Sequence, residues 1–479
     1  MNYKVIKNII GWVLRIEAVC MILPLICALI YEEREMVGVF FVSMLLCFLA
    51  GALCGIKPPE NKAMYAKEGL ITVAISWIVI SLFGSVPFFT SGYIPNFVDA
   101  LFETVSGFTT TGASILSDVE ALPRSLIFWR SFSHWIGGMG VLVFLVAILP
   151  LSGSNNMFLV KAESTGPSVS KLVPGVKTSA KILYGLYIGL SFAQVILLLI
   201  GGMNLFEALT ITFGTAGTGG FGTMNSSAAD YSPYCQYVIT VFMIIFGIDF
   251  SVFYLLLMRK FRLALRSDEV KGYLCIIAVS VAIITFNCLE FYGTLEETFR
   301  HSVFQVASII TTTGYSTTNF DAWHELSKTV LLILMFIGAC AGSTGGGIKV
   351  SRIIILLKSI VKEIKIAVHP KTVMKIKMNG RIVEHETVRS VNVFMISYLV
   401  VFVVSWLILS IDDMGLETSF SAVAATLNNI GPGFAGVGPV QNFGSFSLLS
   451  KTVMIFNMLI GRLEIFPMLV LISPYTWKK

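Results

Sequence analysis

Long apolar stretches recur along the whole chain, and polar stretches rich in glycine and threonine stand between some of them. Ten apolar stretches approach or exceed the about 20 residues that a helix needs to cross a bilayer, from residues 9–30 to a stretch ending near Ile472. The pattern predicts an all-α polytopic membrane protein. Lys4 and Lys7 precede the first stretch as in a signal peptide, but the stretch is too long and lacks a cleavage pattern, so we expect it to be retained.

Four of the polar stretches resemble one another. They read SGFTTTGASIL (106–116), TFGTAGTGGFG (212–222), ASIITTTGYST (307–317) and TLNNIGPGFAG (426–436). Aligning Gly112 with Gly314 superimposes three threonines of one copy on three of the other. Gly219 and Gly431 fall at corresponding places in the two more divergent copies.

A second repeated motif gives the same register. SKTVLLILMFIG ends at Gly338, and SKTVMIFNMLIG ends at Gly461. These alignments predict four similar units, each made of a span, a short helix, a loop and a second span. The predicted divisions are an N-terminal transmembrane hairpin (1–57) and four pore repeats (68–150, 178–262, 268–366 and 386–473).

The loops have the chemistry of a cation filter. Irregular backbone at membrane depth is stable only where it is buried in protein or lines water. Glycine permits backbone conformations that other residues avoid, so carbonyl oxygens can replace the water shell of a dehydrated cation. One such loop alone would more simply be a re-entrant turn, but four aligned copies favour a filter. Its predicted residues are Thr110, Thr111, Gly112, Thr218, Gly219, Thr312, Thr313, Gly314, Asn429, Ile430 and Gly431.

Charged residues fall into alternating connections. Most of the 34 lysines and arginines lie near the chain ends or in four connections, 57–67, 161–181, 259–271 and 349–389. The positive-inside rule places these connections and both termini in the cytoplasm. Acidic residues, Glu103 and Asp118 among them, collect in the other connections, where a negative vestibule would concentrate cations. The net charge of +6 fits contact with anionic lipid and gives no reason to expect nucleic acid.

A glycine-rich segment, GACAGSTGGGIK, interrupts the second span of the third repeat. Its glycines, together with Ser343 and Thr344, cannot sustain a regular membrane helix. The SKTV alignment places Arg462 at the depth of this break. A positive charge there would face the bundle interior and act as a barrier below a cation filter. The structural alternative is an ion pair of Arg462 with Glu464 or Asp249.

Other classes of function find little support in the chain. The eight cysteines form no CxxC motif and the five histidines show no metal-ligand spacing, which argues against a metalloenzyme. No GxxxxGK[ST] motif is present, so any nucleotide dependence must come from a partner. A secondary transporter with broken helices would have two segments of inverted topology, whereas these four loops share one orientation.

Several motifs together resemble the Trk/Ktr/HKT superfamily of potassium transporters, and its TrkH branch most closely. They are the four loops, WIGGMGVLVF (135–144), GACAGSTGGGIKVSR (338–352) and NMLIGRLEIFP (457–467). The resemblance runs over nearly the whole chain. It implies four M1-P-loop-M2 repeats around a pseudo-fourfold pore, an N-terminal two-helix hairpin, and a homodimer that takes up potassium across the bacterial inner membrane. It also implies one principal filter glycine per repeat, here Gly112, Gly219, Gly314 and Gly431.

The same resemblance implies an intramembrane gate. Its residues here would be Gly338, Gly342, Ser343, Thr344, Gly345, Gly346, Gly347, Lys349 and Arg462. A cytosolic nucleotide-binding regulatory ring of the TrkA type would dock on residues 349–389, for which a lipid-facing basic loop is the alternative. Asp249 departs from the uncharged polar residue expected at its position.

Potassium is the expected permeant ion. Some plant relatives that favour sodium carry serine at the first filter glycine, whereas this chain keeps Gly112. A sodium-permeable or non-selective pore of the same fold is the alternative, and an ion-coupled secondary transporter a more remote one. Arg130, His134 and Trp135 are expected to brace the first short helix rather than to touch ions.

Overall fold

The computed structural model describes residues 1–56, 64–140 and 176–477. The predicted end of the first repeat (141–150), much of the basic connections 57–67 and 161–181, and the two C-terminal lysines lie outside these residues.

Four successive groups of helices share one order, a long helix, a short helix and a descending helix. The long helices are α4 (Ala66–Gly84), α10 (Val176–Ile200), α15 (Asp268–Asn287) and α19 (His385–Leu409). The short helices are α6 (Phe97–Phe108), α11 (Leu205–Gly217), α16 (Leu295–Ile310) and α20 (Leu416–Asn428). The descending helices are α7 (Arg124–Gly138), α12 (Pro233–Phe246), α17 (Glu325–Ile337) and α21 (Leu448–Arg462). These groups are the four predicted repeats.

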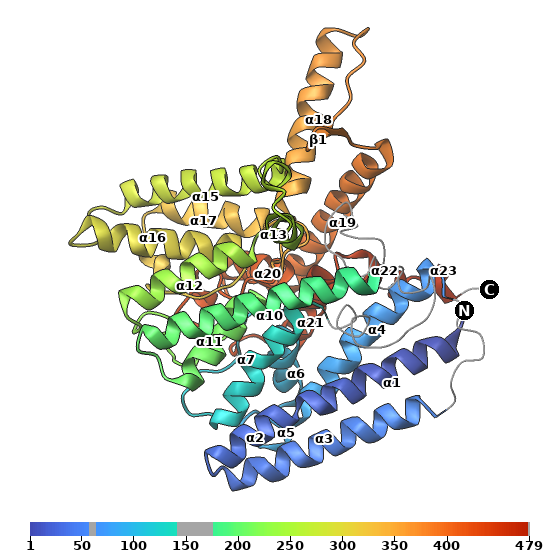
Figure 1. Ribbon diagram of the computed structural model, residues 1–479, viewed down its shortest axis with the longest axis vertical. Helices are drawn as coiled ribbons and strands as arrows, with labels where there is room; N and C mark the ends of the chain where they lie inside the picture. Colours follow the sequence, from blue (N-terminus) through green and yellow to red (C-terminus); the bar gives the residue numbers. More distant parts are fainter. Residues whose placement is uncertain (57–63, 141–175, 478–479) are drawn as a thin grey trace.

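The remaining elements flank the repeats. The N-terminal hairpin consists of α1 (Tyr3–Cys20), α2 (Ile22–Ile30) and α3 (Arg34–Cys54), and α1 and α3 lie side by side in Figure 1. The others are α5 (Val86–Thr90), α13 (Phe250–Leu257), α14 (Phe261–Ala264), η1 (Phe320–Ala322), α18 (Val350–Val368), η2 (Ser410–Asp412), η3 (Ala435–Val437), α22 (Phe466–Ile472) and α23 (Pro474–Trp477). A small antiparallel hairpin pairs β1 (Lys377–Met378) with β2 (Arg381–Ile382), and Lys377 stands opposite Ile382.

The four repeats close into a ring through one recurring contact. Each descending helix packs against the short helix of the next repeat: α7 on α11, α12 on α16, α17 on α20, and α21 on α6. The last contact joins the fourth repeat to the first. The short helices and the loops that follow them therefore surround a common centre, which is the pseudo-fourfold arrangement expected from the sequence.

Three of the four descending helices end at a break in the described residues. The axes of α12 and α13 differ by 93°, and α17 and α21 each end before a non-helical segment that leads to α18 or α22. The sequence predicted a break only in the third repeat. The ten apolar stretches thus divide into six helices long enough to cross a membrane within the described ranges, and four shorter descending helices.

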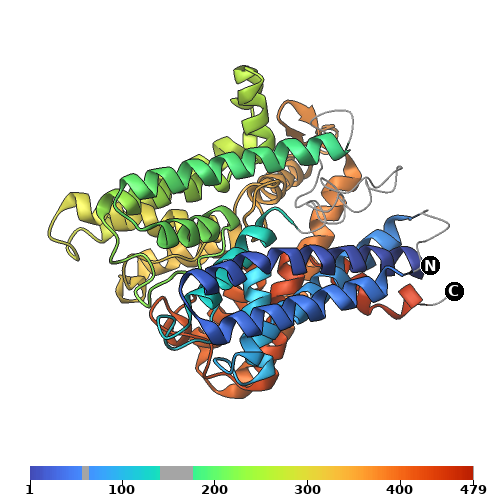
Figure 2. The same cartoon turned by 60° about the horizontal axis from the view of Figure 1, so that its bottom comes forward.

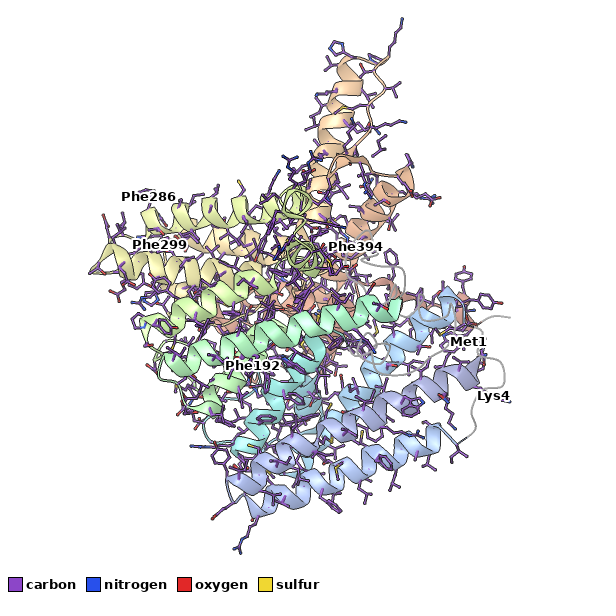
Figure 3. The ribbon with its side chains drawn as sticks, viewed as in Figure 1. Met1, Lys4, Phe192, Phe286, Phe299 and Phe394 are labelled. Carbon is purple, nitrogen blue, oxygen red and sulfur yellow. The ribbon has the colours of Figure 1, made fainter. Side chains whose placement is uncertain are left out.

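Large apolar side chains cover the outside of the bundle. Phe192 on α10, Phe286 on α15 and Phe299 on α16, all labelled in Figure 3, are 66%, 76% and 44% exposed. Apolar surface of this extent is stable in lipid but not in water. The two chain ends lie near each other at one end of the molecule in Figures 1 and 2.

Candidate functional site

The four short helices end in the same way. Each is followed by a residue with left-handed backbone, with φ of 55°, 55°, 60° and 56° for Thr110, Thr218, Thr312 and Asn429. The next N–H donates to the carbonyl five residues earlier, from Thr111 to Ser106, Gly219 to Gly214, Thr313 to Ser308 and Ile430 to Ala425. This is the Schellman ending, in which the left-handed position is usually glycine. A left-handed threonine costs about 1–3 kcal/mol, so the surrounding structure holds these three residues in a strained conformation.

A second left-handed residue, always glycine, follows two positions later. These glycines are Gly112, Gly220, Gly314 and Gly431, with φ of 79°, 78°, 88° and 95°. A Cβ on any of them would overlap or crowd a carbonyl oxygen of the next loop, namely that of Gly219, Thr313, Ile430 and Thr111 respectively. The fourth loop meets the first, so the loops form a closed ring. Each glycine is required both by its φ and by the neighbouring carbonyl.

The geometry corrects the register of the second loop. Gly220, and not Gly219, is the backbone counterpart of Gly112, because Gly220 has the left-handed φ and touches the third loop. Gly219 is the counterpart of Thr111, and its carbonyl faces Gly112. The signal in the sequence was the threonine two positions earlier, since Thr218 aligns with Thr110 when Gly220 aligns with Gly112.

A polar cavity of about 180 Å³ lies on one side of this ring and is bordered by all four left-handed glycines. Acidic residues were expected to line such a vestibule, but none stands among the described residues that border this cavity. They lie at its rim instead, where Asp118 accepts from the Asn225 amide at 2.8 Å and Asp321 accepts from the Ala435 N–H at 3.1 Å. The Asn225 hydrogen bond lowers the pKa of Asp118, which favours its charged form.

Glu103 is not part of the solvated outer face, contrary to its assignment with the outer acids. It is 1% exposed, and the Arg130 Nε lies 2.5 Å from its Oε1. Glu103 also accepts from the Ser114 hydroxyl at 3.0 Å and from the Ile115 N–H at 3.0 Å. The ion pair therefore ties the first loop to α6 and α7. Such buried pairs arise from tertiary packing, which the sequence pattern does not encode.

Arg130 and His134 also support the second loop. The guanidinium carbon of Arg130 lies 3.5 Å from the ring centroid of Phe221. His134 accepts from the Phe221 N–H at 3.2 Å, so its Nδ1 carries the proton that is donated to the Gly107 carbonyl at 2.7 Å. Trp135 donates to the Ser191 hydroxyl at 3.2 Å. As expected, Arg130 and His134 brace the first short helix, through Glu103 and the Gly107 carbonyl, whereas Trp135 bonds to α10.

Breaking the buried ion pair should destabilise the protein. Arg130→Met leaves the Glu103 carboxylate buried without its cation, which we expect to cost about 3–5 kcal/mol and to lower the half-denaturation temperature in detergent by several degrees. Lys328→Met removes a lysine from the surface pair with Glu325 and should change stability by less than about 1 kcal/mol. The double variant Arg130→Met with Glu103→Gln should recover part of the loss. Equal losses for Arg130→Met and Lys328→Met would contradict the assignment.

The segment between α17 and α18 lies against the other side of the ring. The Gly346 N–H donates to the Thr312 hydroxyl at 2.6 Å, and the Gly347 N–H donates to the Asn428 carbonyl at 3.1 Å. The Thr344 hydroxyl donates to the Phe246 carbonyl at 3.2 Å. We call residues 338–349 the gate loop and the four loops after the short helices the filter loops, after the roles that the sequence predicts for them. The gate loop is bonded to the second, third and fourth repeats close to the filter loops.

Arg462 connects the gate loop to the first repeat. Its guanidinium donates to the Thr344 carbonyl at 2.9 Å, to the Gly138 carbonyl at 2.8 Å and also to the Gly137 carbonyl. It approaches the Thr110 hydroxyl at 3.3 Å. The side chain is 9% exposed. The sequence thus placed Arg462 correctly beside the gate loop.

The two acidic residues that the sequence offered as ion-pair partners of Arg462 make contacts elsewhere, as does Lys349. Glu464 forms an ion pair with Arg352, whose guanidinium lies over the ring of Phe394, labelled in Figure 3, at 4.0 Å. Asp249 caps α13 by accepting from the Ser251 N–H at 2.8 Å. Lys349 is 1% exposed and donates to the Gly345 carbonyl within the gate loop.

The site has no donor set for a metal held by side chains. Among the described residues, no group of three or more His, Cys, Asp or Glu side chains could hold a metal ion. The oxygen atoms that meet the four left-handed glycines of the ring are backbone carbonyls. Oxygen ligands of this kind suit a monovalent cation that passes through rather than a resident metal.

Comparisons with known proteins agree with this geometry. Residues 37–288 and 291–478 match the profile of a family described as TrkH, cation transport protein. The chain is similar to Trk system potassium uptake proteins TrkH from Salmonella typhimurium (35% identity) and Vibrio parahaemolyticus (36%), in each case over all of both chains. It is also similar, at 33% identity over all of both chains, to the crystal structure of the potassium transporter TrkH from Vibrio parahaemolyticus, with a TM-score of 0.89.

Proposed function

Because the chain belongs to the TrkH family of cation transport proteins, we propose that it carries potassium ions into the bacterial cell across the inner membrane. The family consists of transport proteins, so the chain is a transporter and not an enzyme. The observation that carries the proposal is the closed ring of four equivalent loops, in which each left-handed glycine touches a carbonyl of the next loop.

The ring supports a mechanism in which the ion loses its water. Potassium would enter from the polar cavity, exchange water for carbonyl and threonine oxygens of the filter residues, and leave on the side of the gate loop. The membrane potential would drive this movement, because each 100 mV is worth about 2.3 kcal/mol per charge. Potassium is then the permeant ion, and no nucleotide enters the reaction at a site in this chain.

Residues 338–347 and Arg462 would form the gate. The described conformation supports a closed state, since the gate loop lies against the filter loops and Arg462 bonds both to Thr344 and to the first repeat. Opening would require these hydrogen bonds to break. The guanidinium also places a positive charge beside Thr110, where it would repel a cation leaving the filter.

The assembly and its orientation are part of the same proposal. Both termini, which lie at one end of the molecule, would be cytoplasmic, in keeping with the positive-inside rule. The protein would act as a homodimer, with a cytosolic nucleotide-binding ring of the TrkA type docking on residues 349–389. A sodium-permeable or non-selective pore of the same fold is the alternative, and the retained Gly112 favours potassium.

The purified protein in liposomes tests the transported ion directly. With a potassium gradient and an imposed potential, negative inside, we expect uptake of radioactive rubidium. Unlabelled potassium should block this uptake, and sodium at the same concentration should not. Expression should also restore growth of a bacterium that lacks its potassium uptake systems at low external potassium. Equal inhibition by sodium and potassium would favour the non-selective alternative, and absence of cation flux in both assays would refute the proposal.

A further inference from the structure

Both ends of the gate loop meet a single carboxylate. Glu269, in the first turn of α15, accepts from the Ala341 N–H at 2.7 Å and from the Ser351 N–H at 3.0 Å, both on its Oε1. Ala341 lies near the start of the gate loop, and Ser351 lies in the first turn of α18 just beyond its end. Glu269 is only 8% exposed. Backbone hydrogen bonds from Ile348, Lys349 and Val350 to residues 336, 337 and 339 already join the two ends to each other. The buried Glu269 oxygen atom therefore attaches the joined ends of the gate loop to α15.

The residues between these two contacts include points where the backbone can turn. Gly342 and Gly347 have φ of 74° and 75°, and Lys349 has φ of 84°. Most of the hydrogen bonds that hold the segment against the filter loops come from residues 344–347. If Glu269 released its two contacts, the base of the gate loop would be freed from α15, and the segment could turn about these residues without unfolding α17 or α18.

The residue before Glu269, Asp268, is bonded to the β1–β2 hairpin and to α18. Asp268 accepts from the Asn379 N–H at 3.0 Å and from the Lys358 Nζ at 3.2 Å, and its own N–H donates to the Asn379 side-chain oxygen at 2.7 Å. Asn379 lies in the turn between β1 and β2, and Figure 1 shows this hairpin beside α18. The first turn of α15 therefore links the hairpin to the gate loop through two adjacent carboxylates.

We propose that Glu269 is a positioning residue that keeps the gate loop closed, and that Asp268 makes the position of Glu269 depend on the β1–β2 hairpin. This inference rests on the proposed role of residues 338–347 as the gate. A force on the hairpin, which lies beside Lys358 midway along α18, would move the first turn of α15 and with it both ends of the gate loop. The filter loops contact neither carboxylate directly, so selectivity should not change.

Flux measurements separate this role from a general effect on the pore. Glu269→Gln keeps an oxygen acceptor but loses the negative charge that strengthens both hydrogen bonds. In liposomes containing the full chain, it should raise rubidium flux about five-fold or more, with the potassium-to-sodium ratio unchanged. Glu325→Gln, which neutralises an exposed carboxylate at the far end of α17, is the matched control and should behave like the parent. Asn379→Gly keeps the left-handed φ but removes the side-chain acceptor, and should raise flux by a smaller factor. The double variant of Glu269 and Asn379 should match Glu269→Gln alone.

Cys340 provides a native probe of the position of the gate loop. It is fully buried next to Ala341, whereas Cys235 is buried in α12, away from the gate loop. In Glu269→Gln, a small maleimide should label Cys340 at least five-fold faster than in the parent, with labelling of Cys235 unchanged. Equal acceleration at both cysteines would mean general loosening and would overturn the positioning role.

The gate variant Arg462→Ala makes the two proposals distinguishable. If it raises flux while Glu269→Gln leaves both flux and Cys340 labelling at the parent values, the role of Glu269 is refuted and the gate stands. If neither variant raises flux or exposes Cys340, the gate assignment fails and the role of Glu269 fails with it. A change in the potassium-to-sodium ratio in Glu269→Gln would also overturn the inference.

Discussion

Replacing Gly112 by serine is expected to lower the ratio of potassium to sodium flux by roughly ten-fold or more, equivalent to about 1.4 kcal/mol of discrimination. Gly112 has φ of 79°, and a side chain there would overlap the Gly219 carbonyl oxygen. That carbonyl must therefore move. It is the oxygen that the second loop would offer to the ion. The measurement is rubidium uptake into liposomes with potassium or sodium as competitor.

A matched glycine separates the effect on the ring from backbone strain. Gly92 also has φ of 79°, but a Cβ there would meet nothing within 4 Å. Gly92→Ser therefore carries the same conformational cost without displacing a carbonyl, and should keep the parent ratio. If both variants changed the ratio equally, the ring assignment would lose its support. Gly220→Ser should resemble Gly112→Ser, because its Cβ would overlap the Thr313 carbonyl.

Replacing Arg462 by alanine is expected to raise flux in the absence of any activator by about 10-fold to 100-fold. A unit charge about 6 Å from a cation, at an effective dielectric constant of about 20, opposes it by about 3 kcal/mol. The substitution also removes the hydrogen bonds to Thr344 and Gly138 that hold the gate loop to the first repeat. Flux in liposomes without any cytosolic partner measures the effect.

Two further substitutions show which property of Arg462 matters. Arg462→Lys keeps the charge but cannot reach all the carbonyls that the planar guanidinium serves, so a smaller rise is expected. Lys328→Ala, at the exposed end of α17, removes a charge far from the gate loop and should leave flux unchanged. A fall in flux for Arg462→Ala, with normal folding, would show that the residue supports conduction instead of closing the pore.

The repeats and the gate loop could be predicted because identical motifs recur at equal depth. Alignment of the two SKTV motifs placed Arg462 beside the break in the third repeat, and the hydrogen bond to Thr344 confirms that placement. The register of the second loop was wrong because the alignment used the first of two adjacent glycines, Gly219 and Gly220. Aligning Thr218 with Thr110 selects Gly220 instead, and its left-handed backbone confirms that register.

Pairings between distant helices could not be predicted from the chain alone. Glu103 looked like one of many outer acids, and its burial depends on Arg130, 27 residues away, turning toward it across the first repeat. Glu269 lies in the basic connection 259–271, which the positive-inside rule assigns to the cytoplasm, and nothing in that pattern indicates a further role for this residue. Its two contacts with the gate loop span 72 and 82 residues. No local pattern carries information over that separation.

The contact between α21 and α6 has a consequence for biosynthesis. Three of the four junctions in the ring join consecutive repeats and can form while the chain emerges, but the fourth needs the last descending helix, Leu448–Arg462. Until the ribosome has released that helix, the first loop lacks the neighbour that places Gly431 against Thr111. The proposed pore can therefore be completed only after almost the whole polypeptide has entered the bilayer, so that half-made chains would not leak ions.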